Sequence, residues 1–286
     1  EIAEYKRNTL KTKNTTIEFP WATNPDSKLR KELGLSNINQ ENIEKLFEVC
    51  ESEFNQSLLF LRHLNRIELK RNGKSSLIVK LDRKEISDKH NKLSISFEPE
   101  NRAAEEWLVF DNKCPDEKAT KLKNKYEPLA REKRKSEIQI AVKTDSISIG
   151  RGLLYAYLPT QQSSYLPLHI NADFYPDPNR KSINLQGGQH QQKWNELLIA
   201  EAAEIIANEL DTMTEYINHK HLFRLFVASY NAEKNHDFPF TAFWDCIEKS
   251  VKDGVKVFYS SKDEYEKFDD IVFDQNLDER KKIELS

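Results

Sequence analysis

Glycine is scarce in this sequence, with seven among 286 residues. The few glycines form neither a G-x-G-x-x-G nor a G-x-x-x-x-G-K pattern, which excludes a dinucleotide-binding fingerprint and a P-loop. No glycine stands two positions after an aspartate, so an Asp-x-Gly turn that grips adenine is also absent. The chain by itself is therefore not expected to bind ATP.

Cysteines and long apolar runs are equally sparse. Cys50, Cys114 and Cys246 lie far apart and form no C-x-x-C pair, which excludes a zinc knuckle and a disulfide framework and indicates the reducing cytoplasm. The apolar runs are too short to span a membrane. The sequence begins at Glu1 with a segment too polar for a leader, so we interpret it as a piece of a longer protein.

The charge is nearly balanced, with a formal net charge of −3. This value gives no general attraction to nucleic acid or to acidic membranes. Residues 118–135 form a basic run that could contact phosphate backbones. Glu127 and Glu132 interrupt this run and Tyr126 is its only aromatic residue, so a solvated helix face is favoured over a nucleic-acid site.

Residues suited to catalysis or metal binding are few and scattered. His219 and His221 are two positions apart, and on a helix such residues face different directions, so they cannot share a metal ion. His169 lies in an alternating strand without a nucleophile motif beside it, which favours a hydrogen-bonded structural histidine. An independent enzyme is not expected, although the chain is consistent with a part of one.

Apolar spacing predicts an ordered series of elements. Before the loop at Gly187-Gly188 these are a strand at 15–20, a helix at 39–63, a hairpin at 66–81 turning at Asn72-Gly73, strands at 92–98 and 106–111, a helix at 115–136, and strands at 137–142, 153–159 and 166–174. After the loop they are helices at 194–217, 219–232 and 240–252, and strands at 255–261 and 269–274.

This order predicts an α/β (α+β) fold in which a mixed sheet with helices precedes a mainly helical region. We place a domain boundary near Gly187-Gly188. The expected divisions are residues 1–20, residues 21–187, and residues 188–286 with a small terminal strand pair.

The stretch "LPLHINADFYPDPNRKSI", residues 166–183, begins as a strand and then turns sharply. Pro176 and Pro178 each fix a φ angle, so the turn that presents Arg180 and Lys181 is stiff. A buried strand that ends in a rigid turn with two cations is suited to contact a phosphate. We predict that this phosphate is held outside the chain.

Five stretches, in order over residues 14–275, resemble the sacsin-like branch of the GHKL ATPases, the superfamily of gyrase B, Hsp-ninety chaperones, histidine kinases and MutL. "NTTIEFPW" resembles the strand G-T-x-F-R-x-P-L, with Asn14 for glycine and Trp21 for leucine, and "SLLFLRHLNRIEL" resembles the segment that follows it. "LLYAYLPT" with "SYLPLHINADFYPDPNRKSI" is similar to F-L-P … L-P-x-H-x-N-x-x-F-x-x-x-x-N-R. "KWNELLIAEAAEIIANEL" and "VKVFYSSKDEYEKFDDIVF" resemble its later helix and the segment after the helices.

This resemblance implies the transducer, or middle, region of such an ATPase. It implies a ribosomal S-five-type sandwich with a left-handed βαβ crossover, and ATP and magnesium bound by an upstream domain whose closing strand is residues 1–20. Arg180, assisted by Lys181, would contact and sense the γ-phosphate, as a catalytic arginine does in the Hsp-ninety chaperones. Hydrolysis would thereby be coupled to domain motion in a chaperone-like or defence machine.

Several alternatives remain open. The chain could be a protein- or nucleic-acid-binding module without nucleotide coupling, and Arg180 could form a local salt bridge with Asp173 or Asp177. We also predict that residues 58–61 are helical, so that their apolar side chains face different ways and place Arg62 at a domain interface. Large aromatic residues after Gly188 would contact a client or a second copy, or else fill a helical core: Trp194, Phe223, Phe226, Phe238, Phe240, Phe243 and Trp244.

Overall fold

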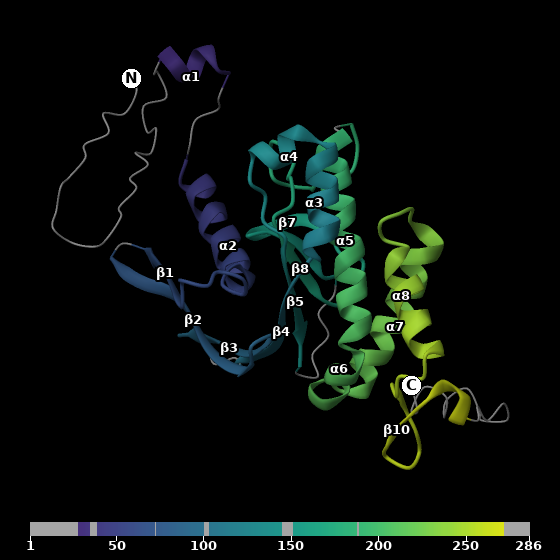
Figure 1. Cartoon of the computed structure of the whole chain (residues 1–286). Helices are drawn as coiled ribbons and strands as arrows, with labels where there is room; N and C mark the ends of the chain where they lie inside the picture. Colours follow the sequence, from purple (N-terminus) through teal and green to yellow (C-terminus); the bar gives the residue numbers. More distant parts are fainter. Residues whose placement is uncertain are drawn as a thin grey trace. The chain divides into compact units, whose positions relative to one another are not determined.

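The computed structural model describes residues 28–34, 39–71, 73–99, 103–144, 151–187 and 189–271. The chain divides into two compact units, residues 1–53 and residues 54–286. The predicted mixed class of helices and strands is confirmed (Figure 1). The strand expected at residues 15–20 lies outside the described residues.

The first unit contains α1 (Lys28–Glu32) and the greater part of α2 (Gln40–Ser57). Asn39 and Asn42 cap the start of α2 reciprocally, because each side-chain oxygen accepts the other residue's backbone N–H, at 2.9 and 3.0 Å. The helix ends at Ser57, so the prediction of a helix through residue 63 is wrong at its end.

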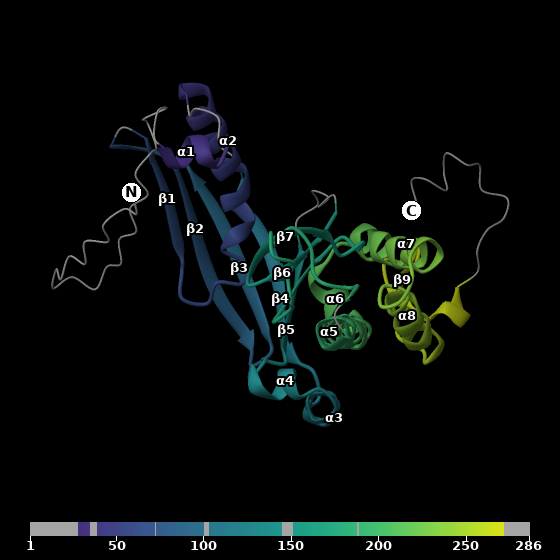
Figure 2. The same cartoon turned by 90° about the horizontal axis from the view of Figure 1, so that it is seen from above.

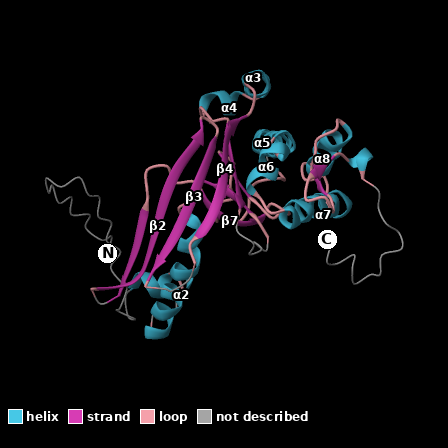
Figure 3. Cartoon of the chain, turned by 90° about the horizontal axis from the view of Figure 1, so that it is seen from below, coloured by secondary structure: helices cyan, strands magenta, loops and turns pink. Residues whose placement is uncertain are grey.

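The second unit is built around an eight-stranded sheet in the order β1-β2-β3-β4-β5-β8-β6-β7, whose long strands are seen in Figure 3. Neighbouring strands are antiparallel except β6 and β8, which are parallel. The strands are β1 (Arg66–Arg71), β2 (Lys74–Ser87), β3 (His90–Glu98), β4 (Glu105–Lys113), β5 (Glu137–Lys143), β6 (Leu153–Ala156), β7 (Leu158–Ser163) and β8 (His169–Ala172).

Two turns shape the ends of this sheet. The predicted hairpin is confirmed, and Gly73 adopts a φ of +77° between β1 and β2, which glycine adopts at little cost. The single strand predicted at 153–159 is instead two antiparallel strands. The break falls at Tyr157, whose φ is +66°.

The basic segment between β4 and β5 forms two helices, α3 (Asp116–Lys125) and α4 (Glu127–Arg131), where one had been predicted. Tyr126 between them is extended, with a φ of −127°. Pro128 explains the break, because in one continuous helix its ring would clash with the carbonyl group of Asn124 and it has no N–H to donate to that carbonyl.

The connection between the parallel strands β6 and β8 runs through β7 and contains no helix. Helices α3 and α4 instead join β4 and β5, which are antiparallel neighbours. The connection therefore differs from the helix-containing crossover that the family resemblance implies.

The segment after Gly187 is mainly helical, as predicted. Its helices are α5 (Gln189–Asn208), α6 (Leu210–Tyr216), α7 (His219–Asn235) and α8 (Ala242–Lys252). Helix α5 lies against the sheet and α8 packs on α5 (Figure 2). The short strands β9 (Phe258–Tyr259) and β10 (Tyr265–Glu266) follow. A strand was predicted at 269–274, but the structure has a 3₁₀ turn at Phe268–Asp270. Residues 272–274 lie outside the described residues.

Alternate residues of the strands supply two cores, one on each face of the sheet. Leu108 and Ile140 face the core that includes Trp194 of α5. Trp107 and Ala141 face the other core. The first core contains residues from both sides of Gly187-Gly188, while the division into domains at that point stays a prediction.

The turn after α2 covers part of the second core. Leu58, Leu59 and Phe60 are all buried there, although they are not helical. These three side chains therefore join one core without a helix, so the helix predicted at residues 58–61 is wrong, whereas Leu61, the fourth residue of that prediction, is half-buried.

The aromatic residues after Gly188 divide between core and surface. Four are buried in the core, which are Trp194, Phe226, Phe240 and Phe243. Phe223 and Phe238 are exposed, and Trp244 is half-buried against Tyr230. None of the described helices has the length and apolar character needed to cross a lipid bilayer.

Candidate functional site

The turn that follows β8 is held together by one carboxylate. Asp177 Oδ1 accepts the backbone N–H groups of Lys181 and Ser182, at 2.9 and 3.3 Å, and Asp177 Oδ2 accepts the Ser182 hydroxyl at 3.0 Å. The backbone bridge between Pro176 and Ile183 closes the loop. This side-chain bonding and the two prolines restrict the turn, which agrees with the stiffness expected from its sequence.

Arg180 lies at the tip of this turn in the left-handed conformation, with a φ of +58°. Its guanidinium Nη2 donates a 2.9 Å hydrogen bond to the carbonyl oxygen of Ala156, at the end of β6. The residue is exposed. Within the described part of the chain, neither Asp173 nor Asp177 pairs with the guanidinium, because Asp173 binds Arg134 and Asp177 binds the turn itself.

Lys181 is fixed through its backbone. Its N–H donates to Asp177 and to Asn179 Oδ1, and its carbonyl oxygen accepts the N–H of Gln161 in β7 at 2.8 Å. Its ammonium is exposed and has no carboxylate partner among the described residues. The turn therefore presents two cations on a backbone that is tied to the sheet.

A row of polar side chains crosses three strands close to this turn. Asp111 of β4, Gln139 of β5 and Asn171 of β8 occupy paired register positions. The Gln139 amide donates to Asp111 Oδ1, and Asn171 Nδ2 donates to Gln139 Oε1 at 2.8 Å. Asn171 Oδ1 in turn accepts the N–H of Tyr157 at 2.9 Å. The row thus connects the sheet to the break between β6 and β7.

Arg62 lies at the other end of the row. Its Nη2 is 3.3 Å from Asp111 Oδ1, and its side chain is 57% exposed. Asn91 donates to the second oxygen of Asp111 at 2.7 Å. Burial lowers the pKa of Arg83, an effect that nearby Asp111 opposes and nearby Arg62 reinforces. The expected role of Arg62 at a domain interface stays a prediction.

A cleft of about 280 Å³ opens between the segment after Phe60 and this end of the sheet. Gln139, Asn171 and Ala172 are buried, whereas Arg62, Lys135 and Tyr157 are exposed. The lining residues are Phe60, Leu61, Arg62, His63, Leu64, Lys135, Glu137, Gln139, Tyr157, Asn171, Ala172 and Asp173.

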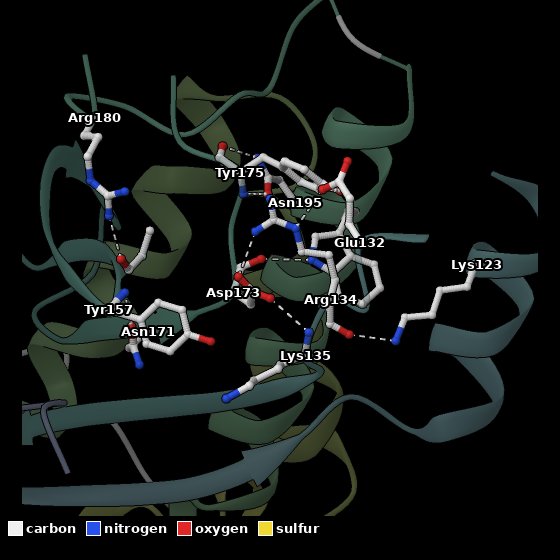
Figure 4. A network of polar contacts seen from close by, with 12 residues as sticks. Lys123, Glu132, Arg134, Lys135, Tyr157, Asn171, Asp173, Tyr175, Arg180 and Asn195 are labelled. Atoms are coloured by element: carbon white, nitrogen blue, oxygen red, sulfur yellow. Dashed lines mark hydrogen bonds and ion pairs between the residues drawn. The ribbon is translucent and has the colours of Figure 1, made fainter. Parts of the chain in front are cut away.

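One wall of the cleft is braced by the network in Figure 4. Arg134 Nη1 donates to Asp173 Oδ1 at 2.8 Å, and its guanidinium stacks 3.7 Å from the ring centre of Tyr175. The Tyr175 hydroxyl donates to Glu132 at 2.7 Å, and burial, reinforced by this hydrogen bond, raises the pKa of Tyr175 to about 12. Asn195 of α5 accepts the N–H of Tyr175 at 2.8 Å, so the helical region supports this wall.

His169 of β8 lies on the same face of the sheet as Asn171. Its contacts agree with its interpretation as a structural histidine. Its Nδ1 accepts the N–H of Leu153 at 3.0 Å, and its ring lies between Trp107 and Tyr155. Burial lowers the pKa of His169 to about 4, which keeps the ring neutral at physiological pH. The described residues include no group of three or more acidic, histidine or cysteine side chains placed to hold a metal ion.

The basic run at 118–135 is partly neutralised by carboxylates. Lys118 pairs with Glu201 at 2.6 Å, and Arg131 pairs with Glu127 at 2.6 Å. Lys123 donates to the backbone carbonyl of Arg134 at 2.7 Å. These pairings reduce the field available to a phosphate backbone, in keeping with the solvated helix face favoured above.

Comparisons with protein family models, curated proteins and solved structures found no match for this chain. The resemblance to GHKL transducers therefore rests on the five sequence stretches alone.

Sequence reasoning located Arg62, Arg180 and Lys181 but not the polar row or Tyr157. The available signal was a polar amide residue in the interior of each of two strands, Gln139 in "EIQIAV" and Asn171 in "LHINA". Their juxtaposition depends on strand register, which those short segments do not specify.

Proposed function

We propose that this chain is a non-catalytic transducer module of a GHKL-type ATPase. In this role Arg180, with Lys181, contacts the γ-phosphate of ATP that an upstream domain binds with magnesium, and hydrolysis is converted into domain motion. A chaperone-like or defence machine with a protein client, and possible homodimerisation, fits this role.

The observation that carries the proposal is the way Arg180 is held. One of its five guanidinium N–H groups is used by Ala156, and the rest have no partner among the described residues. A positioned cation from a neighbouring domain stabilises the charge that develops on a transferred phosphoryl group, provided that its placement is stiff. The Asp177 bonding of the turn supports such stiffness.

Hydrogen exchange in the complete protein tests this contact. If Arg180 meets the γ-phosphate, residues 177–182 become protected with a non-hydrolysable ATP analogue and return to their nucleotide-free exchange rates with ADP. The chain alone, which lacks a glycine-rich nucleotide motif, should bind ATP no better than millimolar by calorimetry. Equal exchange with the analogue and with ADP would contradict the proposal.

The alternative is a protein- or nucleic-acid-binding module that is not coupled to nucleotide. Exposed Phe223 and Phe238 favour a protein partner over nucleic acid, because aromatic residues form interface hot spots and part of the basic run is paired with carboxylates. In that case nucleotide would leave exchange of the turn unchanged and a client would protect α7.

A further inference from the structure

Tyr157 adopts a backbone conformation that is unusual for a residue with a side chain. Its φ of +66° lies in the left-handed region, which is unfavourable for a residue with a Cβ atom. Such conformations persist where the surroundings enforce them, and they concentrate at sites of ligand binding and catalysis.

Two side chains enforce this conformation from opposite sides. Asn171 accepts the N–H of Tyr157, and Arg180 donates to the carbonyl oxygen of the preceding residue, Ala156. Both bonds are 2.9 Å long. The peptide bond between Ala156 and Tyr157 is therefore held on one side by Asn171 of the polar row and on the other side by Arg180 of the turn (Figure 4).

The phenol itself is left available. Tyr157 lines the cleft, the residue is 43% exposed, and its hydroxyl has no hydrogen-bond partner within the described residues. In Figure 4 the side chains of Tyr157 and Lys135, which line the same cleft, extend toward each other. The Lys135 ammonium has no carboxylate partner in the described part of the chain.

Burial, together with two nearby carboxylates, keeps the phenol protonated. Burial raises the pKa of Tyr157, Asp173 and Glu137 reinforce this effect, and Arg134 and Arg62 oppose it. The hydroxyl is therefore a hydrogen-bond donor at neutral pH. Together with Arg62 and Lys135, it offers donors to one ligand from three separate segments of the chain.

We propose that this cleft binds a small organic anion with a single carboxylate or phosphate group, held by Arg62, Lys135 and the Tyr157 hydroxyl. The side-chain amides of Gln139 and Asn171 on the floor each retain an unused N–H for a polar group of the ligand.

Size and charge define the ligand class. A cleft of about 280 Å³ lies just below the range of roughly 300–1,000 Å³ typical of small-molecule pockets, so it fits a compact metabolite. Glu137 and Asp173 line the same cleft and disfavour a polyanion such as a triphosphate. The site is thus distinct from the γ-phosphate contact, and it does not depend on the proposed function.

Nuclear magnetic resonance of this chain tests the site through the side-chain amide signals of Gln139 and Asn171. The probes are inorganic phosphate, glycerol 3-phosphate as an organic phosphate, and lactate as a carboxylate, with uncharged glycerol for comparison. We expect saturable shifts with at least one organic anion and none with glycerol. The response to glycerol 3-phosphate against lactate identifies which anionic group is preferred.

Substitutions distinguish anion binding in the cleft from nonspecific attraction of anions to surface lysines. Lys135→Ala and Tyr157→Phe should each weaken binding about tenfold, the scale of one charge-assisted or neutral hydrogen bond to an anion. Lys121→Ala removes an exposed lysine outside the cleft and should leave the dissociation constant unchanged. Absence of saturable shifts with both organic anions, or equal weakening in Lys135→Ala and Lys121→Ala, would overturn the proposal. Lys135 is exposed, so its variant remains informative if Tyr157→Phe misfolds.

Discussion

Arg180 Nη2 and the carbonyl oxygen of Ala156 are joined by a 2.9 Å hydrogen bond, which connects the turn after β8 to the end of β6. This bond places the sequence-predicted phosphate sensor beside the peptide that carries Tyr157. One arginine thus fixes a strained residue at the cleft and still presents unused donors outward. The transducer proposal and the anion-site proposal therefore concern adjacent but separable groups.

Stability should fall in mild acid because of His169. Its pKa is about 4 in the folded chain, against about 6.5 when unfolded, so between these values the unfolded state binds more protons. The free energy of unfolding therefore increases as pH rises from 4 to 6.5 and levels off above. From pH 7 to pH 5 we expect this residue to cost about 2 kcal/mol, measured by urea unfolding.

A pair of variants identifies the source of this pH dependence. His169→Gln removes the titrating ring, so the difference in stability between pH 7 and pH 5 should shrink by about 2 kcal/mol. His63→Gln changes an exposed histidine and should leave that difference intact. An undiminished difference in His169→Gln would show that other groups cause the acid sensitivity.

The turn after α2 should contribute strongly to stability although it is not helical. Leu59 is fully buried in the core on its face of the sheet, so Leu59→Ala should lower the free energy of unfolding by about 2–5 kcal/mol. Leu64 is 51% exposed, and Leu64→Ala should cost less than about 0.5 kcal/mol. Equal effects of the two substitutions in chemical unfolding would rule out this role of the turn.

Gly152 is required because another backbone segment approaches it closely. A Cβ at this position would lie 1.7 Å from the carbonyl oxygen of Leu168, which is not sterically possible. Gly152→Ala should therefore destabilise the chain by about 3 kcal/mol or more as the strands move apart.

Gly187→Ala is the matched control, since Gly187 has a φ of +85° and open space around it. Its cost should be the backbone strain alone, roughly 1–2 kcal/mol. Thermal unfolding compares the two variants. A Gly152→Ala protein as stable as Gly187→Ala would contradict the close approach.

Sequence patterns correctly predicted those helices and hairpins that are specified by their own residues, through apolar periodicity or a turn dipeptide. The Asn72-Gly73 hairpin and helices α7 and α8 are examples. The extent of α2 was wrong because the apolar spacing continues past Ser57, while burial of Leu58 and Leu59 in a turn overrides that periodicity. The break at Tyr157 was missed because "LLYAYLP" is a continuous run of apolar and aromatic residues, which is typical of one buried strand.

The candidate site was predictable only in part, for a related reason. Prolines in the sequence are enough to predict a stiff turn that presents Arg180. Its bond to Ala156 spans 24 residues, and the row from Asp111 to Asn171 depends on the register of three strands. Such long-range pairings are set by packing of the whole sheet, so no local window of the sequence contains them.

The most direct test of the central claim is the rate of ATP hydrolysis by the complete protein with Arg180→Ala. If Arg180 senses the γ-phosphate, hydrolysis should fall about a hundredfold or more while ATP affinity stays within a few-fold, because one transition-state contact is lost. Arg131→Ala, which removes an exposed arginine paired with Glu127, should hydrolyse ATP at the normal rate. Unchanged hydrolysis in Arg180→Ala would contradict the transducer account.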